Sequence, residues 1–313
     1  MPSESRLPLG FRLAERSAKN GMEEERAVNE KQLPEKSSEP GFSYFEIQAH
    51  WGVTKHMGGL KATGELAELC HIGRDKYVLE VGCGAGTITC HLVKRYGCRI
   101  VGVDISDRML DWSRKRAKRK GLEDRVEFRT ADAQDLPFED ALFDAVISES
   151  VTAFPADKHK AVSEYVRVTK PGGFVGLNEG TWVKAPPPSD LVEYVDRIMA
   201  NARFLTAGGW KELLESSSLT EIVVRTHRVN ALSQRLDEMR GLDFHDVLDR
   251  FRAWGSFLSL YARSPGFREY AREITPSARV IKSLFAYLGY GIYVGRAPQQ
   301  APPSPNSPQT PCT

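Results

Sequence analysis

Three glycines at alternate positions, Gly82, Gly84 and Gly86, are the residues whose type and spacing point most directly to ligand chemistry. They follow an apolar and partly β-branched run at 77–81, which predicts a strand that is covered on both faces. Glycine permits a positive φ and lets a ligand approach the main chain closely. Residues 87–96 carry apolar side chains at helical spacing, so a helix should follow. A strand, a glycine turn and a helix predict a site for a nucleotide-type ligand.

The spacing of the glycines separates two classes of cofactor. A dinucleotide fingerprint has the order G-x-G-x-x-G, whereas this chain has G-x-G-x-G, with Thr87 where the third dinucleotide glycine would stand. Glu80 comes two residues before the first glycine. The pattern E-x-G-x-G-x-G resembles the first motif of the class I S-adenosylmethionine-dependent methyltransferases. A glycine turn that binds nothing is the alternative that the glycines alone leave open.

Two aspartates follow the next two expected strands. Asp104 ends the strand expected at 99–103, where a carboxylate can accept both hydroxyl protons of a ribose. A methyltransferase and a dehydrogenase would both use it, so Asp104 does not separate the two classes. Asp132 follows the strand expected at 125–130. In the methyltransferase family this acidic residue lies beside the adenine together with the next main-chain N–H, here that of Ala133, and a dehydrogenase has no reason for this cluster.

The third match to the family is the run R-V-T-K-P-G-G at 167–173. It stands between a helix expected at 158–169 and a strand expected at 174–177, where the proline ends the helix and the glycines make the turn. The three matches occur in the family's order and at its spacing. The resemblance covers about 77–182 and implies S-adenosylmethionine as the cofactor.

The resemblance also implies which residues contact that cofactor. They are Gly82, Gly84, Gly86, Asp104, Ile105, Asp132 and Ala133. Glu80 would hold the glycine loop or the amino group of the methionine. We add Ser148, the last residue of the strand expected at 143–148, as a further contact.

Two glutamates are candidates for a base or for orienting the methyl acceptor. Glu149 follows the fourth expected strand and Glu179 follows the fifth. In an open parallel sheet, ligands bind outside the carboxyl ends of the strands. Methyl transfer is an in-line displacement, so the acceptor atom must lie about 3 Å from the methyl carbon. An exposed acid without a role is the alternative for Glu179.

Two histidines in the segment before the glycine strand are further candidates. His50 and His56 are candidates because histidine is the residue type that most often transfers protons near neutral pH, and a histidine without a catalytic role is the alternative for each. The pair Gly58-Gly59 followed by Thr63 resembles the region before the first strand of phosphobase and sterol-type methyltransferases. A packing helix with a glycine kink is the alternative reading of that segment.

The order of the elements predicts an α/β fold. The resemblance implies a Rossmann-like, seven-stranded mixed sheet whose last strand pair is antiparallel, with helices on both faces. We expect the methyltransferase domain at 41–296, with helical lid or cap insertions at about 183–207 and 232–287. The second insertion is rich in aromatic residues and should shape the acceptor pocket, or serve oligomerisation instead. Polar composition predicts disorder at 1–40, apart from a short helix, and proline predicts it at 297–313.

Composition excludes several classes of protein. The net charge of +2 on 313 residues gives no global field for nucleic acid or an anionic membrane. The five cysteines include no C-x-x-C pair, so we expect no metal site or disulfide framework, and reduced thiols in a cytoplasmic protein. No apolar run is long enough for a membrane span, and the N-terminus has no targeting pattern. The Asn/Asp-Pro-Pro-Tyr motif of base methyltransferases is missing after the fourth strand.

We therefore expect a methyltransferase that acts on a small, apolar or amphipathic, lipid- or isoprenoid-like acceptor by in-line displacement. The alternatives are N-methylation of a small polar amine or phosphobase, a protein that binds S-adenosylmethionine without turnover, and a nicotinamide-dependent reductase. Neither the acceptor nor the methylated atom nor the oligomeric state follows from the sequence, because the cap and the N-terminal segments resemble the family least.

Overall fold

The computed structural model describes residues 43–52, 56–199, 202–228 and 244–299 of the 313-residue chain. The expected N-terminal extension at 1–40 and the C-terminal tail beyond residue 299 lie outside the described residues.

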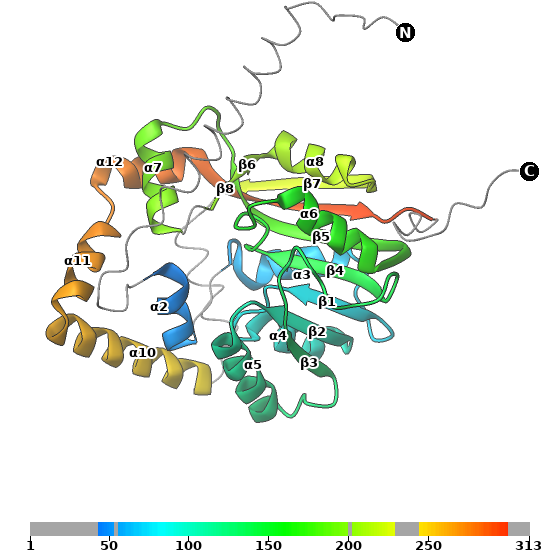
Figure 1. Cartoon of the computed structure of the whole chain (residues 1–313), viewed down its shortest axis with the longest axis horizontal. Coiled ribbons are helices and arrows are strands. Elements are labelled where there is room, and N and C mark those ends of the chain that lie inside the picture. The colour runs from blue at the N-terminus through cyan, green and yellow to red at the C-terminus, as the bar shows by residue number, and fades with distance from the viewer. Residues whose placement is uncertain (1–42, 53–55, 200–201, 229–243, 300–313) are drawn as a thin grey trace, which may run out of the picture. The chain divides into compact units, whose positions relative to one another are not determined.

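A mixed sheet with the strand order β3-β2-β1-β4-β5-β8-β7 forms the centre of the fold (Figure 1). Its strands are β1 (Tyr77–Val81), β2 (Arg99–Asp104), β3 (Val126–Thr130), β4 (Phe143–Glu149), β5 (Thr169–Trp182), β7 (Thr220–Arg228) and β8 (Leu288–Arg296). The first five run parallel, whereas β8 is antiparallel to both β5 and β7. The predicted Rossmann-like mixed sheet with an antiparallel last pair is confirmed. A two-residue strand, β6 (Leu205–Thr206), pairs with β5 in addition to the seven expected strands.

Helices cover both faces of this sheet. Those outside the cap are α2 (Tyr44–Trp51), α3 (Gly59–Leu69), α4 (Thr87–Tyr96), α5 (Asp107–Lys120), α6 (Lys158–Val168), α7 (Ser189–Ile198) and α8 (Ala207–Ser216). Successive strand residues point to opposite faces. Val78 therefore lies in one hydrophobic core with Leu66 of α3 and Leu92 of α4, whereas Leu79 lies in a second core with Tyr165 of α6 and Trp210 of α8.

The junction between α6 and β5 differs from the sequence prediction. The run at 167–173 is not a turn that precedes the strand, because Thr169 already pairs with Phe143 of β4. The next pair joins Ala145 to Phe174, so four residues of β5 lie opposite one residue of β4. Gly172 has a φ of +73° inside this bulge. The proline and glycines therefore bend the strand without interrupting it.

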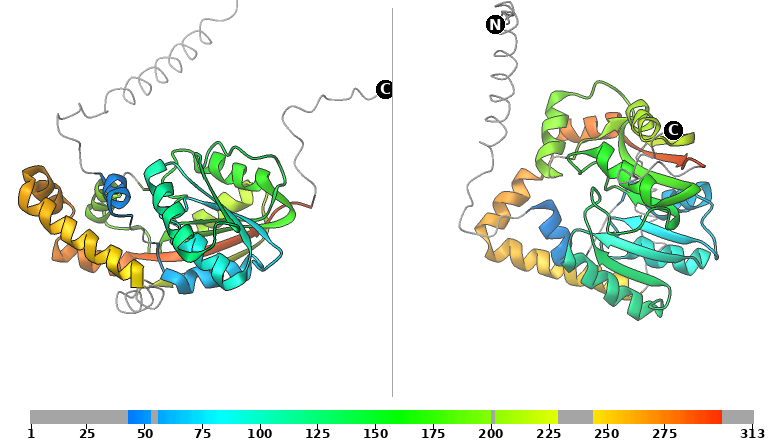
Figure 2. Two further views of the ribbon diagram at one scale, coloured as in Figure 1. Left: turned by 90° about the horizontal axis from the view of Figure 1, so that it is seen from below. Right: turned by 45° about the vertical axis from the view of Figure 1, so that its right-hand side comes forward.

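The second insertion forms a helical cap between β7 and β8. It consists of α10 (Phe244–Arg263), α11 (Pro265–Glu273) and α12 (Ala278–Tyr287), and its predicted part at 232–243 lies outside the described residues. α10 and α11 lie beyond the carboxyl ends of the parallel strands (Figures 1 and 2). The cap packs on α2, where the ring centroids of Trp51 and Phe257 are 5.6 Å apart.

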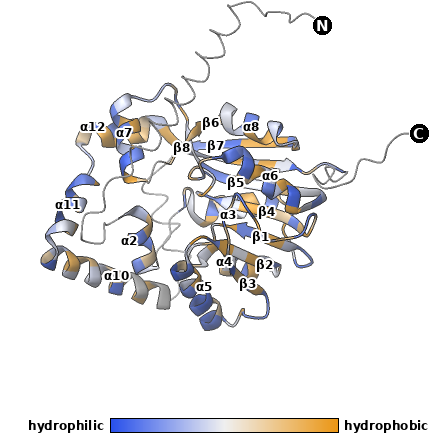
Figure 3. Ribbon diagram, viewed as in Figure 1, coloured by the Kyte–Doolittle hydropathy of each residue, from blue (hydrophilic) through white to orange (hydrophobic). Residues whose placement is uncertain are grey.

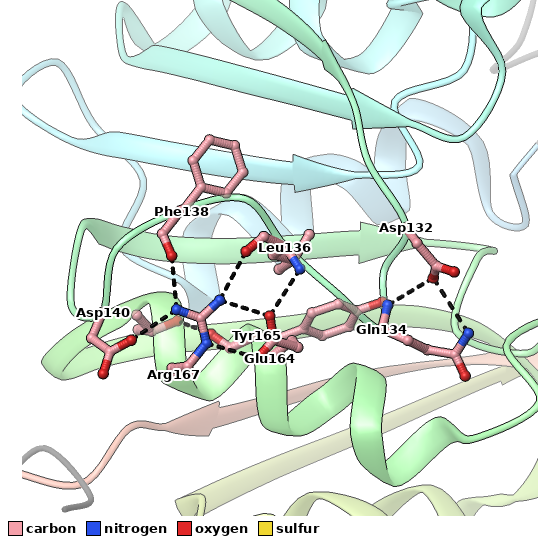
Figure 4. A network of polar contacts seen from close by, with 9 residues as sticks. Asp132, Gln134, Leu136, Phe138, Asp140, Glu164, Tyr165 and Arg167 are labelled. Atoms are coloured by element: carbon pink, nitrogen blue, oxygen red, sulfur yellow. Dashed lines mark hydrogen bonds and ion pairs between the residues drawn. The ribbon is translucent and has the colours of Figure 1, made fainter. Parts of the chain in front are cut away.

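A charged network fastens the loop between β3 and β4 to α6 (Figure 4). Arg167 donates to the main-chain oxygens of Leu136 (2.9 Å) and Phe138 (2.7 Å). It also pairs with Glu164 (2.7 Å) and Asp140 (2.8 Å). Burial raises the pKa of Glu164, but hydrogen bonds from Arg167 and from the main chain of Leu136 lower it more, so the net direction is downward.

Replacing Arg167 by alanine should lower the free energy of unfolding by about 2 kcal/mol, because several charge-assisted bonds are lost and two carbonyls lose their donor. The difference from wild type should shrink as the pH falls through the lowered pKa of Glu164, because a protonated carboxyl no longer attracts the guanidinium. Urea unfolding at several pH values measures both effects. The exposed pair of Lys211 and Glu215 on α8 offers the control, since Lys211→Ala should cost at most about 0.5 kcal/mol. An equal loss in both variants would contradict this account.

Candidate functional site

A cavity of about 370 Å³ opens at the carboxyl ends of the parallel strands. Of the residues that the sequence predicted as cofactor contacts, most line it: Gly82, Gly84, Asp104, Ile105, Asp132 and Ala133. Gly86, Glu80 and Ser148 are not among its lining residues. The strand order changes direction at β1, which lies between β2 and β4, and this is where an open parallel sheet binds ligands.

Gly82 and Gly84 of the turn form part of the cavity wall, where neither has a side chain to fill the space. Gly82 has a φ of +73°, and a Cβ built there would lie 2.2 Å from a methyl carbon of Val151. Any larger residue at this position would force the segment after β4 away from the turn. Gly86 caps the N-terminus of α4 at a φ of +70°, so its role is in starting the helix and not in lining the cavity.

Asp104, the last residue of β2, is held by the main chain of Gly84 in the glycine turn and by that of Ser106, which caps the next helix, α5. One carboxylate oxygen accepts from the main-chain N–H of Gly84 (2.9 Å) and the other from that of Ser106 (2.9 Å). Burial raises the pKa of Asp104, and these hydrogen bonds oppose that rise. A carboxylate has about four acceptor positions, so the main-chain donors to Asp104 do not use all of them.

Asp132 lies on the same cavity as Asp104, at the end of β3. Its Oδ1 accepts from the main-chain N–H of Gln134 at 2.8 Å, which fixes the loop that carries it. The structure therefore brings the two aspartates and the intervening Ile105 to one site, as expected from three parallel strands that end at one edge.

Two predicted residues, Glu80 and Ser148, are buried and do not line the cavity. Glu80 accepts a hydrogen bond from the hydroxyl of Thr89 and so ties β1 to α4. Burial raises its pKa to about 8. The hydroxyls of Ser148 and Thr152 are 3.0 Å apart inside the protein.

Two of the candidates, Glu179 and His50, do not line the cavity. Glu179 is fully buried and accepts from the main-chain N–H groups of Val151 (3.0 Å) and Thr152 (2.7 Å), while burial raises its pKa to about 7. It therefore supports the segment whose Val151 lines the cavity. His50 is exposed on α2, and its Nε2 lies 3.5 Å from the hydroxyl of Ser256 in the cap.

The other two candidates come together in one polar cluster. The Nε2 of His56 lies 3.1 Å from the hydroxyl of Thr63, which donates to Glu149 Oε2 at 3.1 Å. Asn178 donates to the same oxygen at 2.8 Å and to the main-chain oxygen of Met57 at 2.8 Å. Glu149 lines the cavity, its side chain is 1% exposed, and its Oε1 has no hydrogen-bond partner among the described residues.

Asn178 and the aromatic residues beside the cavity are the parts that sequence reasoning missed. Asn178 directly precedes Glu179, and the period-2 alternation of a strand was the signal that puts the two on opposite faces. Tyr44 and Phe45 of α2 line the cavity together with Phe154, with ring centroids 5.0–6.2 Å apart. The cluster of aromatic residues at 44–51 was visible in the sequence, but not its position over the strand ends.

Neither a metal cluster nor a membrane-spanning helix occurs among the described residues. No group of three or more His, Cys, Asp and Glu side chains there is arranged to hold a metal ion. None of the described helices combines the length and the apolar character needed to cross a membrane.

Comparison with known proteins agrees with this site. Residues 79–177 match the family model of a methyltransferase domain. An uncharacterized protein of Haemophilus influenzae is 34% identical over 180 residues, which are 57% of this chain and 72% of that protein. The 27-O-demethylrifamycin SV methyltransferase of Amycolatopsis mediterranei is 30% identical over 229 residues, 66% of this chain and 83% of that enzyme.

Two further matches widen the comparison. Phosphoethanolamine N-methyltransferase 1 of Arabidopsis thaliana is 27% identical over 185 residues, which are 58% of this chain and only 37% of that enzyme. A solved S-adenosylmethionine-dependent methyltransferase of Thiobacillus denitrificans, in complex with S-adenosyl-L-homocysteine, has a TM-score of 0.59 at 15% identity, over 80% of this chain and 96% of that one. At 15% identity, the likeness to the Thiobacillus structure shows a shared fold.

The fold and the cavity define a class I methyltransferase domain. The chain belongs to the S-adenosylmethionine-dependent methyltransferases, and within them to the enzymes of small-molecule type.

The buried carboxyl of Glu80 should make stability depend on pH. Its pKa is about 8 in the folded chain and near the ordinary 4.5 in the unfolded chain, so the folded state binds the proton more tightly. The free energy of unfolding should therefore fall as the pH rises from 4.5 to 8, by up to about 1.4 kcal/mol per pH unit. In Glu80→Gln this fall should be smaller, with the contribution of Glu179 remaining. Urea unfolding at pH 6 and pH 8 measures the slope, and the same slope in both proteins would contradict the assignment.

Proposed function

We propose that the cavity binds the nucleoside of S-adenosylmethionine, with Asp104 holding the ribose hydroxyls and Asp132 with the main chain of Ala133 holding the adenine. The support is geometric, because the two carboxylates line one cavity together with Gly82 and Gly84, which have no side chains to fill it. Ile105 would cover the adenine with apolar surface. The methionine end would lie against Gly82 and Gly84, where the main chain can be approached closely.

The charges of this site suit a cationic cofactor. Asp104 and Glu149 line the cavity, and the buried Glu80 lies behind it. Besides burial, the negative charges of Glu149 and Asp104 raise the pKa of Glu80, so these acids repel one another without a cation. When bound, the cofactor supplies an activated methyl group on a positively charged sulfur. Favourable interaction with several acids would offset their mutual repulsion.

Aromatic side chains beside the cofactor residues bear on the class of methyl acceptor. We infer a small apolar or amphipathic acceptor, because Tyr44, Phe45 and Phe154 place aromatic surface beside the cofactor residues. The name of the Amycolatopsis relative, which acts on a demethylrifamycin, is consistent with such a molecule. N-methylation of a polar amine is the second candidate. It is favoured by the unpartnered oxygen of Glu149 and by the phosphoethanolamine relative, since a buried acceptor oxygen calls for a donor.

Glu149 is the residue that we assign to the acceptor's proton. It lies at the carboxyl end of β4, lines the cavity and keeps one oxygen without a partner. Thr63 and Asn178 orient the other oxygen, and His56, which is partly exposed, extends the hydrogen-bonded chain toward the surface through Thr63. The main work of the protein is still positioning, which can supply on the order of 7–11 kcal/mol of barrier reduction.

The cofactor assignment is tested by Asp104→Ala. S-adenosylmethionine binding, measured by isothermal calorimetry, should become undetectable, because the ribose loses its acceptor and the glycine turn loses the carboxylate that holds Gly84. Asp111→Ala on the exposed face of α5 is the control and should bind as the wild type does. Unchanged binding by the Asp104 variant would overturn the assignment.

The catalytic assignment is tested with labelled S-adenosylmethionine and fractionated cell extract. Wild-type protein should transfer label into an apolar or amphipathic fraction. Glu149→Gln should reduce transfer by about 100-fold or more while cofactor binding persists, because general-base catalysis typically contributes that much. His50→Gln should leave transfer unchanged, since His50 is exposed beside the cap. Label in a polar amine fraction would favour the second candidate, and cofactor binding without any transfer would indicate a binding protein.

A further inference from the structure

The outer face of α10 carries a stripe of large apolar side chains. Phe251, Trp254, Leu258 and Tyr261 are 71%, 65%, 60% and 43% exposed. Their spacing of three, four and three residues places them on one side of the helix. Phe257 makes the aromatic contact of α10 with Trp51, and Trp254 and Tyr261 touch Phe257 with ring centroids 5.9 and 6.4 Å away while much of their surface stays exposed.

Beside the stripe and the side that carries Phe257, α10 has a third side that is polar. Arg252, Ser259 and Arg263 are exposed around it. Apolar and polar residues alternate along the helix surface (Figure 3). A helix with exposed Trp, Phe and Leu on one side and arginines on another has the composition of helices that lie in the headgroup region of a membrane. Trp and Tyr are the side chains that this region favours.

The cap also differs in charge from the rest of the chain. Residues 244–287 contain seven Arg and Lys against four Asp and Glu, a net charge of +3, whereas the whole chain has a net charge of +2. The near-neutral total therefore conceals a basic cap. Positive charge near an anionic lipid surface contributes about 1 kcal/mol per residue to binding.

A second cavity, of about 560 Å³, adjoins the stripe. Tyr261 belongs to both, and Ile274 and Arg272 of the following segment also line the cavity. It therefore combines apolar surface with an exposed guanidinium, which suits a lipid chain that ends in a phosphate group.

From the stripe, the charge and this cavity we propose that the outer face of α10 docks on an anionic phospholipid membrane. The proposal is independent of methyl transfer, although a membrane-bound cap would lie next to α2 and so to the cavity of an amphipathic acceptor. Binding would bury the stripe in the headgroup region, with Arg252, Arg263 and Arg272 near the lipid phosphates.

The test is cosedimentation of the full chain with vesicles, without cofactor. Binding is expected to vesicles of equal parts phosphatidylglycerol and phosphatidylcholine, and much less to phosphatidylcholine alone. Salt should weaken it. Phe251→Ser combined with Leu258→Ser should weaken binding by about 100-fold, since two apolar side chains no longer leave water. Arg272→Gln should weaken it about fivefold, and only on the anionic vesicles.

Val223→Ser is the matched control, because Val223 is an exposed apolar residue on β7 away from the cap. It should bind vesicles as the wild type does. Circular dichroism checks that each variant is folded. Absence of wild-type binding, or equal loss in the control, would overturn the proposal. A different result would also overturn it: the wild type does not bind vesicles, light scattering shows that it is a dimer, and the variant with Phe251→Ser and Leu258→Ser is a monomer. The stripe would then be covered by a second copy of the chain.

Discussion

The close approach of the segment after β4 to the turn after β1 is the constraint on which the rest of the site depends. The main-chain N–H groups of Gly82 and Cys83 both donate to the carbonyl of Val103, so the turn is fixed to β2 on one side. On the other side, Val151 occupies the space that any side chain at position 82 would need. The cavity lies between these contacts because the parallel strands end at one edge of the sheet and Gly82 and Gly84, which line it, have no side chains.

Buried carboxylates hold this arrangement together. Glu80 fixes β1 to the helix that follows it, and Glu179 fixes the start of the segment after β4 by accepting from two of its N–H groups. Glu149 joins the ends of β4 and β5 to the segment around Met57 through Thr63 and Asn178. Charged groups in such positions cost free energy unless they are well hydrogen-bonded. Burial raises the pKa of Glu80 to about 8 and that of Glu179 to about 7, so protonation near neutral pH lowers the cost of burying these two carboxyl groups at the strand ends.

The sequence predicted the parts of the fold that depend on local signals. The helix at Thr87–Tyr96 matches its expected bounds because Gly86 at its start and Gly97 at its end both take a left-handed conformation. The bulge in β5 could not be predicted, because proline and glycine indicate that the chain bends but not that Thr169 keeps pairing with Phe143.

In the candidate site, too, the features that depend on local sequence signals were predictable, and those that depend on packing were not. Asp104 and Asp132 were predictable as neighbours, since each follows a parallel strand and such strands end at one edge of the sheet. The contact of His56 with Thr63 and Glu149 depends on how the N-terminal helices fold over that edge, and no spacing in the sequence contains this information. Glu179 and Asn178 show the limit most clearly, because adjacent residues at a strand end face opposite ways and only packing decides which one reaches the cluster.

The position of β8 has a consequence for how the protein is made. This strand comes after the cap in the chain, yet it lies between β5 and β7. On the ribosome, the five parallel strands and their glycine turn emerge well before it, and β5 has an unpaired edge until residues 288–296 follow. Unpaired edges invite pairing with other chains. The time needed to translate the cap is therefore also the time during which the nascent sheet is open to misassembly.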